Sequence, residues 1–93
     1  MYVENKNVTA DPAGEGVVRK VLSYSPNIMA VELHFEKGAI GAKHSHPHEQ
    51  IGYIISAGDT YYVAPNVVHG VKTLEETMLL DMFTPMREDF IHK

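Results

Sequence analysis

The chain has 93 residues, of which 44% are hydrophobic and 22% are charged, and its formal net charge is −4. These values predict one soluble globular domain over residues 1–93, and the lack of a basic stripe excludes nucleic acid as an expected partner. There is no cysteine, which excludes disulfides and thiolate ligands. The N-terminus has no apolar run, so we expect no signal peptide, no membrane span and a cytoplasmic protein.

The elements predicted along the chain are short β-strands. Residues 1–16 are expected to form an N-terminal arm that ends in the turn residues DPAGEG. Alternating apolar positions and β-branched residues predict strands at 17–22, 29–35, 50–56, 60–63, 71–74 and 77–83. The barrel is expected over 17–85, and 86–93 is expected to be a tail with one helical turn. Short strands at close spacing predict an all-β sandwich or barrel.

Four of the six histidines lie in the stretch from His44 to Gly70. His44 and His46 are two residues apart, so on an extended strand both project to the same side. Gln50 follows four residues after His46, and His69 comes after a further turn. Neutral imidazoles suit Zn, Ni, Cu or Fe(II), and an amide oxygen is a weaker additional ligand. This set predicts a divalent metal site with an open coordination position, as catalysis needs.

Other assignments of these histidines stay open at this point. An isolated His-x-His pair can be a surface feature that binds nothing. His48 is a further candidate ligand, although the turn around it is expected to direct it outward, and Glu49 is an alternative to Gln50 as the oxygen ligand. His34 is on the polar face of its predicted strand and His92 is near the C-terminus, and both are expected at the surface.

Two segments resemble the paired motifs of the cupins. Gly38 to Gln50 resembles the first motif, with Gln where Glu is commoner, and Gly58 to His69 resembles the second. Longer runs, "VELHFEKGAIGAKHSHPHEQIGYIIS", "AGDTYYVAPNVVHG" and "LLDMFTPMREDF", resemble the KdgF-like branch of the cupins over roughly residues 17–90. The resemblance implies a jelly-roll β-barrel and a divalent metal such as Ni, Zn, Fe or Mn. The ligands it implies are His44, His46, Gln50 and His69.

The resemblance also implies a substrate and an active site. KdgF-like cupins act on 4,5-unsaturated uronates released from pectin or alginate, and they promote conversion of the cyclic sugar to its linear ketonised form. The partner implied for this chain is therefore a small sugar acid. The D-x-F-x-x-x-R pattern that lines the family's site is matched by Asp81, Phe83 and Arg87.

These three residues also have an independent chemical interpretation. A carboxylate inside an apolar strand is costly unless it is paired or ligated, so Asp81 is either a structural ion-pair or bulge residue or, if it faces inward near the metal, a proton-transfer group. Arg87 can hold a sugar carboxylate through two hydrogen bonds, or it can form a surface ion pair with Glu88 or Asp89. Phe83 is either a core residue or a stacking surface for the sugar.

The chain departs from the cupin pattern between the two motifs. Ala57 stands where the first motif ends on glycine, and Gly58 already opens the second. The β-hairpin that cupins place there is missing, so we predict a barrel shortened by one hairpin, with strands 50–56 and 60–63 joined as antiparallel neighbours. The loss is expected to expose the edge of the opposite sheet and to favour a homodimer, with strand exchange as one form.

Three functions are compatible with this pattern. The first is an enzyme, a metal-dependent cupin that opens and isomerises unsaturated uronates. The second is a non-catalytic metal- or sugar-binding cupin, and the third is a cupin with other metal chemistry, such as a dioxygenase. Asp81, Phe83 and Arg87 favour the first, because they would supply proton transfer and carboxylate binding next to the metal.

Overall fold

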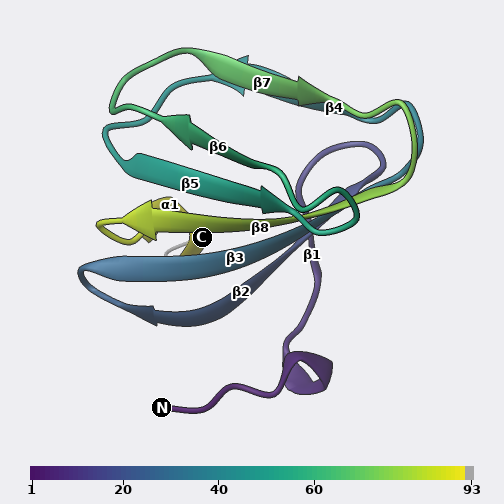
Figure 1. The fold of residues 1–93 in the computed structure, drawn as a ribbon. Helices are drawn as coiled ribbons and strands as arrows, with labels where there is room; N and C mark the ends of the chain where they lie inside the picture. Colours follow the sequence, from purple (N-terminus) through teal and green to yellow (C-terminus); the bar gives the residue numbers. More distant parts are fainter. Residues whose placement is uncertain (92–93) are drawn as a thin grey trace.

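The computed structural model describes residues 1–91 and contains two antiparallel β-sheets (Figure 1). The elements in chain order are η1 (Asn5–Asn7), β1 (Asp11–Pro12), β2 (Val17–Ser25), β3 (Ile28–Phe35), β4 (Ile40–His44), β5 (Glu49–Ile54), β6 (Thr60–Val63), β7 (His69–Lys72), β8 (Thr77–Thr84) and α1 (Glu88–Ile91). The predicted all-β class is confirmed. The strands form two separate sheets, of six and two strands, and not a closed barrel. The expectation for His92 lies outside the described residues.

The larger sheet has the strand order β1-β2-β3-β8-β5-β6. Strand β8 lies at its centre and pairs with β3 on one side and β5 on the other. Strand β8 alternates as the sequence predicts, and the structure shows that its inward face is the one with Leu79, Asp81 and Phe83, which are buried. Met29 and Val31 of β3 are fully buried beside them. The core therefore lies on the inner face of this sheet, and the site is built on the same face.

The two cupin-like motifs meet in a short hairpin between β5 and β6. The predicted antiparallel pairing is confirmed, with a register running from Gln50 opposite Val63 to Tyr53 opposite Thr60. The turn is closed by the Gly58 amide, which donates to the Ile54 carbonyl at 2.8 Å. Gly58 has a φ of +76°, a conformation that glycine adopts without steric cost. No strand intervenes between the two motifs, as the shortened sequence predicts.

The smaller sheet consists of β4 and β7 alone. Its register runs from Ile40 opposite Lys72 to His44 opposite His69. One end is tied by the buried Thr73, whose hydroxyl donates to the Glu36 carbonyl at 2.9 Å. Within the described residues, neither outer edge of this sheet pairs with another strand. The sheet on which two candidate ligands sit is therefore much narrower than the one it faces.

Two strands and one terminus differ from the sequence-based expectation. Strand β4 was not predicted, because IGAKH has no alternation of large apolar residues, and β7 begins earlier than expected, at His69. The N-terminal arm adds β1, which pairs Asp11 with Arg19. The arm is also held by Asn5, which donates to Glu32 at 3.0 Å. Among the described residues, no helix has the length and apolar character that a membrane span requires.

Candidate metal centre and cavity

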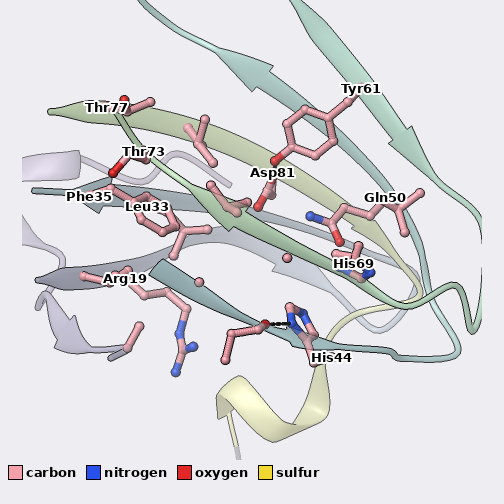
Figure 2. Close-up of a pocket in the computed structure, with 18 of the residues that line it drawn as sticks. Arg19, Leu33, Phe35, His44, Gln50, Tyr61, His69, Thr73, Thr77 and Asp81 are labelled. Carbon is pink, nitrogen blue, oxygen red and sulfur yellow. Dashed lines mark hydrogen bonds between the residues drawn. The ribbon is translucent and has the colours of Figure 1, made fainter. Parts of the chain in front are cut away.

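A cavity of about 900 Å³ lies between the two sheets, and every candidate site residue except His46 lines its wall. Figure 2 shows side chains from both sheets facing this space. His44, Gln50 and His69 lie at one end of this space, whereas Phe35, Thr73 and Thr77 lie toward the other (Figure 2). The lining also includes the charged residues Arg19, Asp81 and Arg87. The cavity therefore has a histidine-rich end and a wall of mixed polar and apolar side chains.

Three histidines converge at the polar end. His44 ends β4, His69 begins β7, and the two are direct cross-strand partners with ring centroids 4.4 Å apart. His46 follows the strand end, and its ring lies 4.9 Å from that of His69. Potential ligand atoms of all three lie within 4.8 Å of one another, so they could hold one metal ion. The loop that follows β4 and the loop that precedes β7 are joined by a hydrogen bond, in which the Asn66 amide donates to the His46 carbonyl at 2.7 Å.

Backbone carbonyls orient two of these imidazoles. His44 Nδ1 lies 2.8 Å from the Ala42 carbonyl, and His69 Nδ1 lies 2.8 Å from the Val67 carbonyl. Since a carbonyl only accepts, each Nδ1 must carry the proton, which leaves the Nε2 lone pair free. Nε2 of His69 is buried and has no hydrogen-bond partner among the described residues. A buried acceptor without a partner is costly, and a metal ion would satisfy it, so this residue fits a metal site.

His46 and Gln50 form a buried polar pair next to the other two histidines. Each is 6% exposed, and His46 Nε2 lies 2.9 Å from Gln50 Oε1. Two ligands about 2.1 Å from one ion would be about 3 Å apart at right angles, so this spacing also fits shared coordination. Burial, and secondarily the charge of Arg87, lowers the pKa of His46. The neutral imidazole, which is the form that binds metals, is therefore favoured.

The alternative ligands lie outside this cluster. His48 Nε2 donates to the Met86 carbonyl at 3.1 Å, which turns the ring toward the C-terminal segment. Glu49 is exposed on the opposite face of β5 from Gln50, and it accepts a hydrogen bond from the Tyr62 hydroxyl at 3.3 Å. His34 lies at the outer face, 2.8 Å from Glu32. The geometry therefore groups Gln50, rather than Glu49, with the three histidines.

Asp81 points into the cavity from the centre of the large sheet. It is 2% exposed, and the Tyr61 hydroxyl donates to its Oδ1 at 2.6 Å. Burial raises the pKa of Asp81, and hydrogen bonds from Tyr61 and Gln50 partly oppose that rise. An ionised carboxylate only accepts, so Gln50 must turn its amide NH₂ toward Asp81 and its oxygen toward His46. Asp81 thus orients the Gln50 oxygen toward the histidine cluster.

Arg87 lies at the cavity wall and is paired with Asp89. Its Nε and Nη2 atoms lie 3.1 and 2.8 Å from the two carboxylate oxygens of Asp89. This is the ion pair with Asp89 that the sequence offered as an alternative, although Arg87 itself is only 9% exposed while the Asp89 side chain is 60% exposed. The Phe90 ring lies 4.2 Å from the Arg87 guanidinium and 3.9 Å from that of Arg19. Two cationic groups therefore flank one aromatic ring beside the cavity.

Phe83 belongs to the core and also to the cavity wall. It is buried in a cluster with Met29 and Val31. Its ring meets His46 edge-on, with centroids 5.5 Å apart. The same residue lines the cavity. The two roles considered for Phe83 are therefore compatible, because one ring can fill the core and limit the site.

Sequence reasoning missed two residues on the cavity wall, Tyr61 and Arg19. Figure 2 shows both among the side chains that face this space. The available signal was strand parity. Arg19 is two residues from both Val17 and Val21 on β2 and therefore shares their inward face. Tyr61 is two residues from the buried Val63 on β6 and shares its face in the same way. Polar side chains that share a face with apolar residues of a strand are therefore candidates for the lining of an internal cavity.

The two facing antiparallel sheets and the histidine cluster at one end of the cavity define the chain as a cupin. An RmlC-like cupin from Shewanella frigidimarina NCIMB 400 superposes with a TM-score of 0.89 and 32% identity, covering 94% of this chain and 92% of that one. KdgF from Halomonas sp. superposes with a TM-score of 0.79 and 28% identity, covering 97% of each chain. The predicted cupin-type jelly roll is confirmed. No family model matches the chain.

The sequence comparison narrows the class further. The pectin degradation protein KdgF of Dickeya dadantii (strain 3937) is 40% identical over 95 residues, covering 84% of this chain and 86% of the relative. This chain belongs to the KdgF family of pectin-degradation cupins, as the resemblance predicted. The alignment has 95 positions, which is more than the 84% of this 93-residue chain that it covers. The relative therefore has residues inside the aligned region that this chain lacks. That difference agrees with a missing hairpin.

Proposed function

We propose that this chain uses a divalent metal to convert 4,5-unsaturated uronates from pectin or alginate breakdown to their linear ketonised form. The observation that carries the proposal is the buried carboxylate of Asp81. It lines the same cavity as His44 and His69 of the histidine cluster, with Tyr61 and Gln50 as hydrogen-bond partners. A family active on pectin-derived sugars supplies the substrate class. The chain's own residues supply the groups that the reaction needs.

The reaction is an isomerisation with two proton movements. Ring opening removes the proton of the anomeric hydroxyl, breaks the bond between C1 and the ring oxygen, and leaves an aldehyde at C1. The ring oxygen remains on C5 and takes up the proton that the anomeric hydroxyl lost, which gives an enol. Tautomerisation then moves that proton from the enol oxygen to C4 and leaves a ketone at C5. Because no proton or electron is gained overall, one carboxyl group that accepts and later returns a proton can serve both steps.

Asp81 is the group proposed for these proton transfers. Burial raises its pKa, which brings its protonated and ionised forms closer in free energy near neutral pH than those of an exposed aspartate. The hydrogen bond from Tyr61 and that from Gln50 hold the carboxylate in one orientation. A pre-oriented carboxyl whose two forms are both accessible is suited to general acid–base catalysis.

The metal ligands proposed are His44, His46, Gln50 and His69. A bound divalent ion would polarise a sugar oxygen as a Lewis acid. The carbonyls of Ala42 and Val67 hold two of the imidazoles with Nε2 available, so little reorientation of the chain is needed for binding. Ni, Zn, Fe and Mn are the candidate ions, and metal analysis of the purified protein distinguishes them.

The sugar carboxylate is proposed to bind near the two arginines. Asp89 already occupies two donor atoms of Arg87, so that residue offers only part of its guanidinium to a ligand. Arg19 brings a second guanidinium to the same wall, stacked on Phe90. Burial, followed by the charge of Arg87, lowers the pKa of Arg19, as expected when two cations share a partly desolvated region. An anionic ligand would relieve that repulsion.

The test is an absorbance assay with a defined substrate. An unsaturated monouronate is generated with a lyase and incubated with protein loaded with Ni, Zn, Fe(II) or Mn. The proposal predicts faster loss of the ultraviolet absorbance of the C=C bond than in a protein-free blank that contains the same metal. No acceleration with any of the four ions would reject the enzyme. Tight uronate binding without turnover would then identify a binding cupin.

We also propose that the chain forms a homodimer through the narrow sheet. Strands β4 and β7 form a two-stranded sheet, and their neighbourhood exposes large apolar side chains such as Ile40 and Leu74. Unpaired edges favour pairing with another chain, and a second copy is the partner that is always present. Light scattering after size exclusion at micromolar concentration should give twice the mass of the chain. A strictly monomeric protein would contradict this proposal.

A further inference from the structure

We propose that Gly52 and Tyr61 form a positioning pair that holds the Asp81 carboxylate for the reaction. The empty side-chain position of Gly52 lets Tyr61 lie across strand β5 and reach Asp81 on strand β8. This inference rests on the proposed function, because it assigns a role within the same site. It adds two residues that belong neither to the D-x-F-x-x-x-R pattern nor to the metal cluster.

The three residues occupy one row across the sheet. Gly52 of β5 is the cross-strand partner of Tyr61 in β6 and of Asp81 in β8. Neighbouring strands are about 4.8 Å apart, so Tyr61 and Asp81 start about 10 Å apart along this row. Their hydroxyl and carboxylate nevertheless meet at 2.6 Å. The tyrosine ring must therefore extend over the intervening strand, through the space above Gly52.

Gly52 is needed for space and not for its backbone conformation. Its φ is not among the positive values found at four other glycines of the chain, so an L-residue could adopt its backbone conformation. A Cβ at this position would overlap with the Cζ, the hydroxyl oxygen and the Cε1 of Tyr61. Because these atoms belong to one rigid ring, the overlap can be relieved only if the whole ring moves. Any residue other than glycine at position 52 therefore displaces the ring and removes the hydrogen bond.

The hydrogen bond has a consequence for the reacting group. Tyr61 fixes Oδ1 of Asp81 from the β6 side, while the Gln50 side chain is a second hydrogen-bond partner of the same carboxylate. The rotation of the carboxyl group is thereby restricted, and rate depends strongly on such orientation. Removal of the Tyr61 hydroxyl should slow the chemical step and leave the metal ligands and the arginines in place.

The first experiment compares Tyr61→Phe with the matched control Tyr62→Phe. Tyr62 is the next residue of β6, is 58% exposed and faces away from the cavity. In Tyr61→Phe we expect kcat to fall about 10- to 100-fold. We expect its KM, and its metal affinity by calorimetry, to stay within about threefold of the wild type. We expect all three to stay near wild-type values in Tyr62→Phe. A kcat of Tyr61→Phe within about twofold of the wild type would overturn the inference.

The second experiment tests the role of Gly52 without substrate. Gly52→Ala should lower the Tm by about 5 °C or more. In a Tyr61→Ala background, where the ring is absent, the same change should lower the Tm by less than about 2 °C. An equal loss in both backgrounds would overturn the geometric argument.

The two experiments also separate this inference from the proposed function. Gly52→Ala should lose about as much kcat as Tyr61→Phe, and the double variant should lose no more, because both changes remove the same hydrogen bond. A wild-type protein with no turnover would reject the proposed function and the positioning role together. An active wild type with an unaffected Tyr61→Phe would reject the positioning role alone.

Discussion

The two sheets contribute to the site in different ways. The six-stranded sheet carries Asp81 on a strand that is paired on both sides, and Gln50 of β5 and Tyr61 of β6 reach that carboxylate from the same sheet. The two-stranded sheet carries His44 and His69 on strands that pair only with each other within the described residues. The groups proposed for proton transfer are therefore set by sheet register. The proposed metal ligands depend on a thin layer that a bound ion would reinforce.

This difference predicts that metal binding stabilises the two sheets unequally. A ligand that binds only the folded state stabilises it by about 4 kcal/mol at a concentration 1,000 times its dissociation constant. An ion shared by β4, β7 and Gln50 of β5 would connect the narrow sheet to the wide one. Hydrogen exchange should slow mainly in β4 and β7 on metal loading, because β3 and β8 are already paired on both sides.

The largest expected effect concerns the wide sheet. Asp81→Asn should lower kcat about 1,000-fold, because it removes the proposed proton carrier. Metal affinity measured by calorimetry should change little, since the ligands remain. Glu49→Gln is the matched control, because this exposed carboxylate lies on the outer face, and it should leave kcat unchanged. Full activity in Asp81→Asn would remove Asp81 from the mechanism.

The second effect compares packing in the two sheets directly. Leu79→Ala in the wide sheet should reduce the free energy of unfolding by about 3 kcal/mol, because it leaves a cavity among buried neighbours. Val71→Ala in the narrow sheet should cost about 1 kcal/mol, since this side chain is only partly buried. Urea unfolding of both metal-free variants measures the difference. Equal losses would contradict the asymmetry.

The third effect concerns the narrow sheet and its ligands. His69→Ala should lower metal affinity about 100-fold, because it removes a ligand whose free nitrogen is already buried and oriented. The rise in Tm on adding metal should fall accordingly. His34→Ala, on the outer face, should retain both the affinity and the Tm rise. Wild-type affinity in His69→Ala would place the metal elsewhere.

The smallest effect distinguishes substrate binding from chemistry. Arg19→Ala should raise KM about tenfold and change kcat by less than about threefold, because it weakens carboxylate binding away from the reacting atoms. Lys20→Ala is the control, as the neighbouring residue points to the opposite face of β2, where it contacts Asn5. A larger effect on kcat than on KM would assign Arg19 to the chemistry instead.

The sequence predicted those structural features that depend on a single strand or a single motif. The alternation in residues 77–83 put Asp81 on one face with Leu79 and Phe83, although it did not say which face points inward, and the hairpin between β5 and β6 followed from the turn at Gly58. Strand β4 was not predicted, because its small residues have no apolar period. The Tyr61 contact with Asp81 was also missed, because it depends on the register of three strands that are distant in the chain.

A metal titration of activity tests the account most directly. Metal-free protein receives increasing amounts of the preferred ion, and bound metal and the rate of absorbance loss are measured in the same samples. The proposed metal-dependent reaction predicts that the rate rises linearly with bound metal and reaches its plateau at about one ion per chain. A full rate without bound metal, or one bound ion per chain with no rate above the blank, would contradict it.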